Sequence, residues 1–381
     1  MKIRKILVLN HEYPPVGGGG GKITQNLAEG LAQNGYDIRI LTTHYKSLPL
    51  YEKNKVEIYR VRSHRTQIFR ASFQDMLLYI CKSIFKGRQI IRTWKPDIIH
   101  AHFAVPAGAA AYVLSKLSGI PYILTIHGGD VPDAAPDKTA RWFKTVYPFT
   151  KIIWKNAQKI IAVSDYVKEL AELKYKADIQ VIGNGINLEN YTPKVIKPHS
   201  KPRIIFVGRL SPEKNPLAIV HTLSALKELD WECIVLGDGI LMPALKDLVK
   251  KKKMDDRISL KGWVSQAEVL KWMGTSDILF MPSLMEGLPV SGLQGLACGL
   301  ALVMSRTGGC VHLVREGKNG YLVEPGDIVG YTNALATLLA EPNLLLKFRQ
   351  LSAKRSTQFS INAVVDAYDK VFKDMAGERK K

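Results

Sequence analysis

The sequence predicts an α/β fold made of two Rossmann-like, doubly wound domains that face a cleft. Short β-branched runs alternate with helical patterns along the whole chain, which is typical of parallel sheets covered by helices on both faces. The length of 381 residues exceeds the roughly 250–300 at which a single core stops growing. The alternation also restarts after 190–202, a polar segment with three prolines that is typical of a linker. We therefore expect one domain over 1–195 and a second over 196–360.

The first series of strands consists of short apolar runs rich in Ile, Val and Leu. We expect strands at Ile6–Asn10, Asp37–Thr42, Ile98–His102, Tyr122–Ile126, Lys159–Val163 and Ile179–Ile182. Helical patterns fill several of the intervals between them, at Ile23–Asn34, Gln74–Trp94, Pro106–Leu117 and Asp165–Tyr175. The start of the chain has an apolar core of only four residues, Ile6–Leu9, followed by His11 and Glu12. We interpret it as a first strand and not as a signal peptide.

The second series repeats the same pattern. We expect strands at Arg203–Val207, Glu232–Leu236, Ile258–Lys261, Ile278–Met281, Ala301–Ser305 and Gly320–Val323. The helices predicted here are Pro216–Glu228, Pro289–Cys298 and one that begins near Pro243 and ends in the basic run Lys250–Lys253. That run suits the negative end of a helix dipole. A last helix, Ala363–Met375, fits either domain by its pattern alone.

Composition excludes several classes of protein. A hydrophobic content of 46% with 23% charged residues is that of a globular chain and not of a disordered one. The four cysteines lie far apart without a C-x-x-C pair, which excludes a disulfide scaffold and a cysteine-rich zinc site and fits a reducing compartment. No apolar run approaches the roughly 20 residues that span a bilayer. We expect a cytoplasmic protein.

The net charge of +20, from 54 basic and 34 acidic residues, is consistent with three kinds of anionic partner: nucleic acid, an anionic membrane surface, or a small anionic substrate. Lys53–Lys95 alone contains 11 basic and two acidic residues. Apolar residues recur there at helical spacing, at Phe73, Leu77, Ile80, Ile84 and Ile91. One interpretation is a basic amphipathic helix in peripheral contact with the inner face of an anionic membrane. The other is a domain helix with a core face and a solvated basic face.

Five consecutive glycines, Gly17–Gly21, follow the first predicted strand. Glycines at such a place let backbone N–H groups approach a phosphate. Neither a P-loop nor a dinucleotide fingerprint fits the spacing, because Val16 and Ile23 stand where the P-loop requires Gly and Ser/Thr. A flexible turn is the alternative, but ordering five glycines costs backbone entropy, which favours a ligand that orders them.

The second domain has its own candidate site at strand ends. Arg209 and Lys214 follow its first strand, where they can bracket a diphosphate, or Arg209 and Lys214 can instead pair with Glu213 on the surface. Glu286 precedes a helix that Pro289 begins. Its carboxylate can accept hydrogen bonds from sugar hydroxyls, or it can simply stabilise the helix dipole. Gln294 lies two turns further along, as a ligand-binding group or an ordinary helix residue.

These residues, taken together, resemble the retaining glycosyltransferases of family 4, which have the two-domain fold called GT-B. The resemblance covers nearly the whole chain in order. It rests on Pro14–Gly18, His100–Phe103, Thr125–Asp130, Val181–Asn187, Gly208–Lys214 and Pro282–Glu324.

The resemblance implies a role for each matching position. Gly17 and Gly18 would approach the donor diphosphate, Arg209 and Lys214 would hold it, and Glu286 would contact the hydroxyls of the donor sugar. His127 would lie near that sugar, with His102 and Asp130 on the acceptor side. The remaining donor-binding positions are Gly208, Val264, Gly287, Leu288, Pro289, Val290 and Gln294. Val264 marks the region that contacts the nucleotide base, and the last helix is implied to return to the first domain.

One position departs from the family pattern. The second Glu of the family's E-x7-E motif, which binds the nucleotide ribose, is Gln294 in this chain. A Gln carbonyl still accepts from a ribose hydroxyl, but a neutral acceptor is weaker than an ionised one.

The expected reaction moves a hexose-type sugar from a nucleotide-diphosphate donor to a glycan or lipid-linked acceptor, with retention, in cell-surface polysaccharide or glycolipid biosynthesis. No D-x-D sequence is present, so we expect no metal and no cofactor. His127 would position the donor sugar, although a lone His is often a hydrogen-bonded loop residue. A sugar-nucleotide 2-epimerase of the same fold is one alternative. A basic nucleic-acid-binding protein is another, against which the chain lacks an aromatic RNA-binding signature and zinc-finger spacing. We therefore expect no nucleic-acid partner.

Overall fold

The computed structural model describes residues 3–68, 71–129, 131, 142–191, 196–197 and 199–378. The chain divides into two compact units. The first, called here the N-terminal domain, is Met1–Gly185 together with Ile361–Lys381, and the second, the C-terminal domain, is Ile186–Ser360. The expected boundary at 195/196 adjoins 192–195, which lie outside the described residues.

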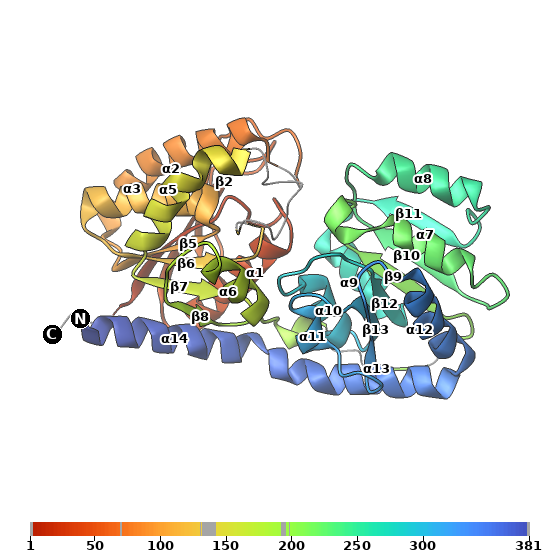
Figure 1. The fold of residues 1–381 in the computed structure, drawn as a ribbon. Coiled ribbons are helices and arrows are strands. Elements are labelled where there is room, and N and C mark those ends of the chain that lie inside the picture. Colours follow the sequence, from red (N-terminus) through yellow and green to blue (C-terminus); the bar gives the residue numbers. More distant parts are fainter. Residues whose placement is uncertain are drawn as a thin grey trace. The chain divides into compact units, whose positions relative to one another are not determined.

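The N-terminal domain contains an eight-stranded sheet in the order β3-β4-β2-β1-β5-β6-β7-β8 (Figure 1). All neighbours are parallel except β3, which runs antiparallel to β4. The strands are β1 Lys5–Leu9, β2 Asp37–Thr43, β3 Tyr51–Lys53, β4 Glu57–Val61, β5 Ile98–His102, β6 Tyr122–Ile126, β7 Lys159–Ala162 and β8 Ile179–Val181. All six predicted strands of this half are present. The edge strand β3 and its neighbour β4 were not predicted, because both are short and carry charged residues, Glu52, Lys53, Glu57 and Arg60.

Helices cover both faces of this sheet. They are α1 Gly19–Gln33, α2 Phe73–Trp94, α3 Ala109–Ser118, α5 Trp142–Asn156, α6 Asp165–Glu172 and α14 Ile361–Glu378. Alternate side chains of the strands, such as Ile6, Ile40 and Ile123, form one core with α1 and α14. The side chains at the other alternate positions point to the opposite face of the sheet. There Tyr122 of β6 donates from its hydroxyl to the Ile153 carbonyl of α5.

Two helix predictions in this domain need correction. The first helix begins at Gly19 and not near Ile23, so three of the five glycines form its first turn. In α2, the predicted apolar stripe is not the buried face. Phe73 and Leu77 are exposed, whereas Tyr79, Ile90 and Trp94 are buried. The burial of Ser83 and Gly87 explains the error, because small residues that face α3 carry no hydrophobic signal.

The C-terminal domain has a six-stranded parallel sheet in the order β11-β10-β9-β12-β13-β14. Its strands are β9 Arg203–Val207, β10 Glu232–Leu236, β11 Ile258–Gly262, β12 Ile278–Met281, β13 Ala301–Ser305 and β14 Gly320–Val323, as the sequence predicted within one residue. Its helices are α7 Leu217–Ser224, α8 Met242–Lys251, α9 Gln266–Gly274, α10 Val290–Ala297, α11 Cys310–Leu313, α12 Ile328–Ala340 and α13 Pro342–Ser356.

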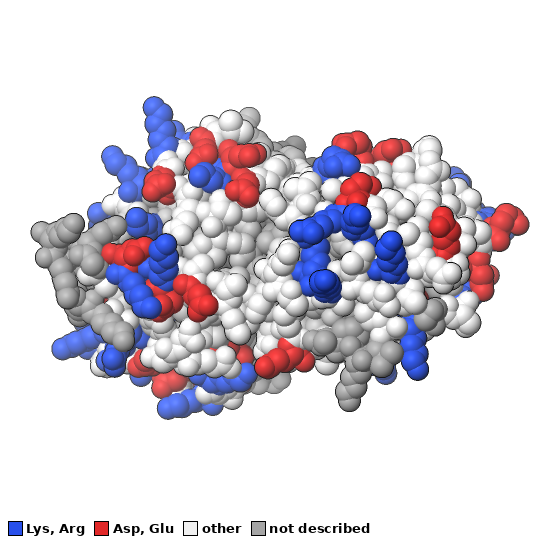
Figure 2. Space-filling view, turned by 90° about the horizontal axis from the view of Figure 1, so that it is seen from below, with Lys and Arg blue, Asp and Glu red and all other residues white. Residues whose placement is uncertain are grey.

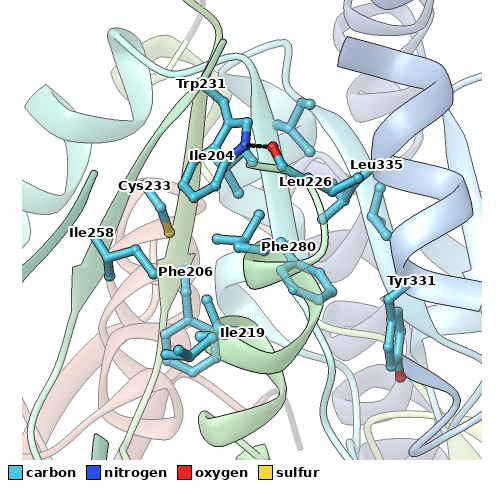
Figure 3. Close-up of a cluster of buried hydrophobic side chains, with 14 of the residues drawn as sticks. Ile204, Phe206, Ile219, Leu226, Trp231, Cys233, Ile258, Phe280, Tyr331 and Leu335 are labelled. Atoms are coloured by element: carbon cyan, nitrogen blue, oxygen red, sulfur yellow. Dashed lines mark hydrogen bonds between the residues drawn. The ribbon is translucent and has the colours of Figure 1, made fainter. Parts of the chain in front are cut away.

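The core of this second sheet is aromatic as well as aliphatic. Figure 3 shows Phe206 and Phe280, from the neighbouring strands β9 and β12, within the cluster that Tyr331 and Leu335 of α12 close. Trp231 is fully buried and donates from its indole nitrogen to the Leu226 carbonyl at 2.7 Å. This packing fixes the strand ends from which the candidate site is built.

The last helix, α14, belongs to the N-terminal domain although it ends the chain. It packs against α1 so closely that a Cβ on Gly30 would lie 2.6 Å from Val365 Cγ2. Tyr36 donates from its hydroxyl to Asp369 at 2.6 Å. Helix α14 thus completes a hydrophobic core that the first 185 residues leave open on one side. No helix in the described part of the chain is long and apolar enough to cross a membrane.

Candidate active site

The glycine segment joins β1 to α1 in the N-terminal domain. Gly17 has a φ of +95°, in the region that favours glycine. A Cβ on Gly20 would lie 2.5 Å from Phe103 Cζ, so this glycine is required for packing inside the helix. Gly17 and Gly20 are therefore explained by the backbone conformation and the packing, two reasons that the sequence did not show. Gly17 and Gly18 precede the helix, with the Gly18 N–H beside a carboxylate.

That carboxylate belongs to Glu12, a residue that the sequence analysis did not single out. Its Oε2 accepts from the Gly18 N–H at 3.0 Å, and its own N–H donates to Asn10 Oδ1 at 2.9 Å. The Glu12 carboxylate thus already accepts from the Gly18 N–H, at the position where the family resemblance implies a diphosphate. The signal that could have found it is its place at the carboxyl end of the first strand, where ligands of open α/β sheets bind.

The other functional residues of this domain stand at the ends of β5 and β6. His102 is the last residue of β5, and His127 follows β6, its neighbour in the sheet. His102 Nδ1 lies 3.1 Å from His127 Nε2, and the two rings stack with centroids 5.3 Å apart. Phe103 covers His127 at 4.5 Å between ring centroids. His102 is almost fully buried, so it lies on the interior side of the His127 ring.

These histidines are held neutral. Desolvation by burial lowers the pKa of His127 to about 4, an effect that the nearby Glu12 carboxylate partly opposes. The same cause brings the pKa of His100 to about 3 and lowers that of His102 well below its usual value. Because all three are neutral at pH 7, the ring nitrogens act as hydrogen-bond partners and not as charges. His100 is fixed in turn by Thr125, whose hydroxyl also contacts Tyr368 of α14.

In the C-terminal domain, Gly208, Arg209 and Lys214 follow β9. Gly208 lies against β10, since a Cβ on Gly237 would come within 1.8 Å of its carbonyl oxygen. The Arg209 guanidinium is 4.0 Å from Glu213, so the surface ion pair considered from the sequence is present at the limit of contact. Lys214 ends a short helical turn, Pro212–Lys214.

Lys214 contacts the loop after β12 and not Glu213. Its Nζ donates to Glu286 Oε1 at 2.6 Å, and the Ser283 hydroxyl donates to the same oxygen at 2.8 Å. Glu286 is buried, and the Glu213 carbonyl accepts from the Leu284 N–H at 2.9 Å, which ties the two loops together. Two residues assigned to one site thus meet in the fold, and Ser283 is a partner that the sequence analysis missed.

The remaining predicted positions surround the start of α10. Gly287 and Val290 are half-buried, and Leu288 and Pro289 are buried. Gln294 is buried on the next turns, where its Nε2 donates to the Tyr191 hydroxyl at 3.2 Å and to Gln266 Oε1 at 3.3 Å. Gln266 begins α9, two residues after Val264, which is half-buried. The segments that contain Val264 and Gln294 are therefore linked through Gln266, and they follow the carboxyl ends of β11 and β12. Asp130 is outside the described residues.

Comparisons with known proteins agree with this architecture. The description "Glycosyltransferase Family 4" matches residues 17–190, and "Glycosyl transferases group 1" matches residues 188–355. The chain is 28% identical to an uncharacterised glycosyltransferase of Methanocaldococcus jannaschii, over 99% of this chain and 100% of that one. It is 26% identical to the UDP-Gal:α-D-GlcNAc-diphosphoundecaprenol α-1,3-galactosyltransferase of Escherichia coli, over 97% of both.

Together the two matches cover most of the chain. The protein is a family 4 glycosyltransferase. Its fold is GT-B, and the solved structure of sucrose-phosphate synthase from Thermosynechococcus elongatus superposes with a TM-score of 0.86 at 18% identity, covering 98% of this chain and 100% of that one. It is accordingly an enzyme of the hexosyltransferase class.

The described part of this glycosyltransferase holds no group of three His, Cys, Asp or Glu side chains arranged to bind a metal ion. Its histidines contact one another through nitrogens and ring faces, as described for His102 and His127. The charged groups that gather at strand ends are Arg209, Lys214 and Glu286 in one domain and Glu12 in the other.

Proposed function

We propose that the glycosyltransferase transfers a hexose from a nucleotide-diphosphate donor to a glycan or lipid-linked acceptor with retention of anomeric configuration. The observation that carries the proposal is the contact of Lys214 with Glu286 at the carboxyl ends of β9 and β12. A cation for the phosphates and a carboxylate for the sugar hydroxyls then stand side by side. This pairing of functions suits a sugar attached to a diphosphate.

In this proposal, Arg209 and Lys214 hold the donor diphosphate, and Gly17, Gly18 and Gly208 let its oxygens approach the backbone. Glu286 accepts from the sugar hydroxyls, Gln294 accepts from the ribose, and Val264 lies beside the base. The half-buried Gly287 before α10 and Val290 at its start supply backbone N–H groups. His127 contacts the donor sugar, with Asp130 in the loop on the acceptor side. His102 acts through His127, because it is buried behind it.

The chemical step in this proposal needs no enzyme nucleophile. The acceptor hydroxyl attacks the anomeric carbon on the face that the diphosphate leaves. The bond between that carbon and the phosphate oxygen breaks with its electrons going to the diphosphate, which takes the proton of the hydroxyl. Arg209 and Lys214 stabilise the charge that develops on the leaving group, which is commonly the largest catalytic contribution. We therefore propose that transfer requires neither a metal nor a cofactor.

The acceptor proposal draws on a relative. The name of the Escherichia coli enzyme describes an acceptor linked to diphosphoundecaprenol, a lipid carrier. By analogy, we propose a role in cell-surface polysaccharide or glycolipid biosynthesis, with the protein in the cytoplasm and in peripheral contact with the membrane. The basic balance of +20 agrees with an acidic partner of this kind.

The test is a thermal-shift panel of UDP-, GDP- and ADP-sugars, followed by analysis of the product. A bound donor stabilises the fold by about 2.7 kcal/mol at a hundredfold excess over its dissociation constant. The donor that shifts the melting temperature is then incubated with lipid-linked acceptors, and the anomeric configuration is read by NMR. An α-linked product from an α-linked donor supports the proposal. Inversion of the anomeric configuration would contradict the retaining step. Formation of a sugar-nucleotide epimer would contradict transfer of the sugar to an acceptor.

A further inference from the structure

Charge is distributed unequally over the two faces of the N-terminal domain. Helices α2, α3 and α5 contain eight Lys or Arg residues, four on α2, one on α3 and three on α5, and a single acidic residue, Asp75. Asp75 is buried and caps its own helix by accepting from the Ser72 N–H at 2.8 Å. On the other side of the sheet, α1 and α14 contain three basic and five acidic residues. Figure 2, which looks onto the side of α14, shows acidic and basic side chains interspersed there.

The three basic helices are neighbours in one layer. Gly87 of α2 faces Leu114 of α3, whose Cδ1 would be 2.6 Å from a Cβ on that glycine. The Ile153 side chain of α5 reaches Gly108, directly before α3. Figure 1 shows α2, α3 and α5 side by side along this domain. We call their solvent-facing side the three-helix surface. It ends at α6, which has three acidic residues, Asp165, Glu169 and Glu172, and whose following segment contacts α5 through the stacked rings of Tyr175 and Trp154.

Large apolar side chains are exposed on the same surface. Phe85 is 69% exposed and Phe149 is 66% exposed, and the others are Phe73, Leu77, Leu117 and Ile152. Among the described residues of α1 and α14, no large apolar side chain is exposed to this extent. Large apolar side chains exposed to water are costly, and a group of them on one face marks an interaction site.

The basic residues of α2 lie among these apolar groups. On its exposed side, Leu77, Cys81, Phe85, Arg88 and Arg92 follow one another at helical spacing. By contrast, part of the charge between 53 and 95 is internal. Arg60 is buried and pairs with Glu52, and Arg65 is buried and donates to backbone carbonyls at 67 and 68. The basic amphipathic character therefore belongs to the helix and not to the whole stretch.

We propose that the three-helix surface docks on an anionic lipid bilayer. Phosphate headgroups neutralise the Lys and Arg side chains, while the phenylalanines and leucines enter the boundary between headgroups and acyl chains, about 5–10 Å deep. A nucleic acid would satisfy the charges but leave the apolar side chains in water. Since a bilayer satisfies both, it is the partner that fits. The proposal deepens the proposed function by naming the surface through which the enzyme reaches a lipid-linked acceptor.

Vesicle binding tests this surface without donor or acceptor, so its failure leaves the transfer reaction untouched. The full chain is co-sedimented with vesicles of phosphatidylcholine alone and of phosphatidylcholine with phosphatidylglycerol. We expect binding only to the second. The pair Lys82→Glu and Arg88→Glu should lower the partition coefficient by about tenfold or more, since each basic residue near the surface contributes on the order of 1 kcal/mol. Phe85→Ser should also weaken binding.

Two matched variants serve as controls. Lys370→Glu reverses an exposed charge on α14, and Val329→Ser removes an apolar side chain of the C-terminal domain that is also 69% exposed. Both should bind vesicles like the unmodified protein. Equal binding to neutral and anionic vesicles, or equal losses in the control variants, would overturn the proposal. So would salt-sensitive binding to DNA or RNA in place of vesicles.

Cys81 allows a direct measurement of contact. It is exposed on α2, whereas the other three cysteines, Cys233, Cys298 and Cys310, are buried. An environment-sensitive fluorophore attached to Cys81 should shift to the blue with anionic vesicles and remain unchanged with neutral ones. A fluorophore placed at Lys370→Cys in a protein that also carries Cys81→Ser should not shift. A shift at the second position and none at the first would contradict the assignment of this face.

Discussion

Lys214 Nζ lies 2.6 Å from Glu286 Oε1, although 72 residues separate them in the sequence. Lys214 is partly exposed and Glu286 is buried, with Ser283 as the second donor to the same oxygen. The two side chains that we assign to opposite ends of the donor sugar-phosphate are thus paired in the fold. A bound diphosphate would draw Lys214 away and leave the carboxylate to the sugar hydroxyls.

Lys214→Ala should lower kcat by about a hundredfold or more, the scale of losing one charge-stabilising donor. It also leaves Glu286 with Ser283 as its remaining side-chain donor, and an unsatisfied buried group costs about 1–3 kcal/mol. Steady-state kinetics with a donor from the thermal-shift panel measures the first effect, and urea unfolding measures the second. Lys318→Ala, at an exposed turn before β14, is the control and should change neither. Near-normal turnover in Lys214→Ala would remove it from the catalytic group.

His102 should affect turnover through the position of the His127 ring. His102→Leu removes the nitrogen that lies 3.1 Å from His127 Nε2 and should lower kcat by about tenfold or more, since small misplacements of reacting groups are costly. His102→Asn places a polar atom near the same point and should recover part of the loss. A rise in the acceptor KM with kcat unchanged would instead show that His102 touches the acceptor.

The sequence predicted the strands better than the details of the site. Short buried strands can be predicted from their runs of apolar residues, and the two sheets contain every strand that was expected. The contact of Lys214 with Glu286 could not be predicted, because it depends on two loops meeting across neighbouring strands. Glu12 was missed for a similar reason. Its proximity to Gly18 follows from the turn that the glycines make, and residue types alone do not determine that turn.

Acid should destabilise the fold through the buried histidines. The pKa is lowered from 6.5 to about 4 for His11 and His127 and to about 3 for His100, in each case chiefly by desolvation. Between these values and 6.5 the unfolded chain binds protons that the folded chain does not. The stability that the neutral rings contribute is therefore complete above pH 6.5 and is lost as the pH falls toward 4.

Urea unfolding at a series of pH values measures this dependence. Each such histidine contributes a slope of up to about 1.4 kcal/mol per pH unit. His100→Gln keeps a polar group near Thr125 and removes one titrating ring, so the slope between pH 4 and 6.5 should become shallower by about that amount. Gln replacement of the exposed His221 is the control. Identical slopes in the unmodified protein and His100→Gln would show that this ring does not resist protonation.

Removal of divalent metals should leave the reaction intact. In the proposed step, Arg209 and Lys214 supply the positive charge on the leaving diphosphate, so EDTA should change kcat by less than about twofold. Turnover before and after chelation measures this, with a transferase of known Mg²⁺ dependence as the positive control. A large loss that added Mg²⁺ restores would contradict the metal-independent step and leave the donor assignment in place.

Gln294→Glu should strengthen donor binding. The buried Gln294 side chain donates to the Tyr191 hydroxyl and to Gln266 Oε1, and a carboxylate at this position can accept from the Tyr191 hydroxyl and from a flipped Gln266 amide. An ionised acceptor bonds the ribose hydroxyl more strongly than a neutral one, by about 1 kcal/mol, so Kd for the donor should fall about fivefold. Gln294→Leu, which keeps the volume and removes the acceptor, should raise Kd. Calorimetric titration with the nucleoside diphosphate isolates this contact from the sugar. If the Glu and Leu variants bind the nucleotide equally, residue 294 serves only the packing of α10 against Tyr191.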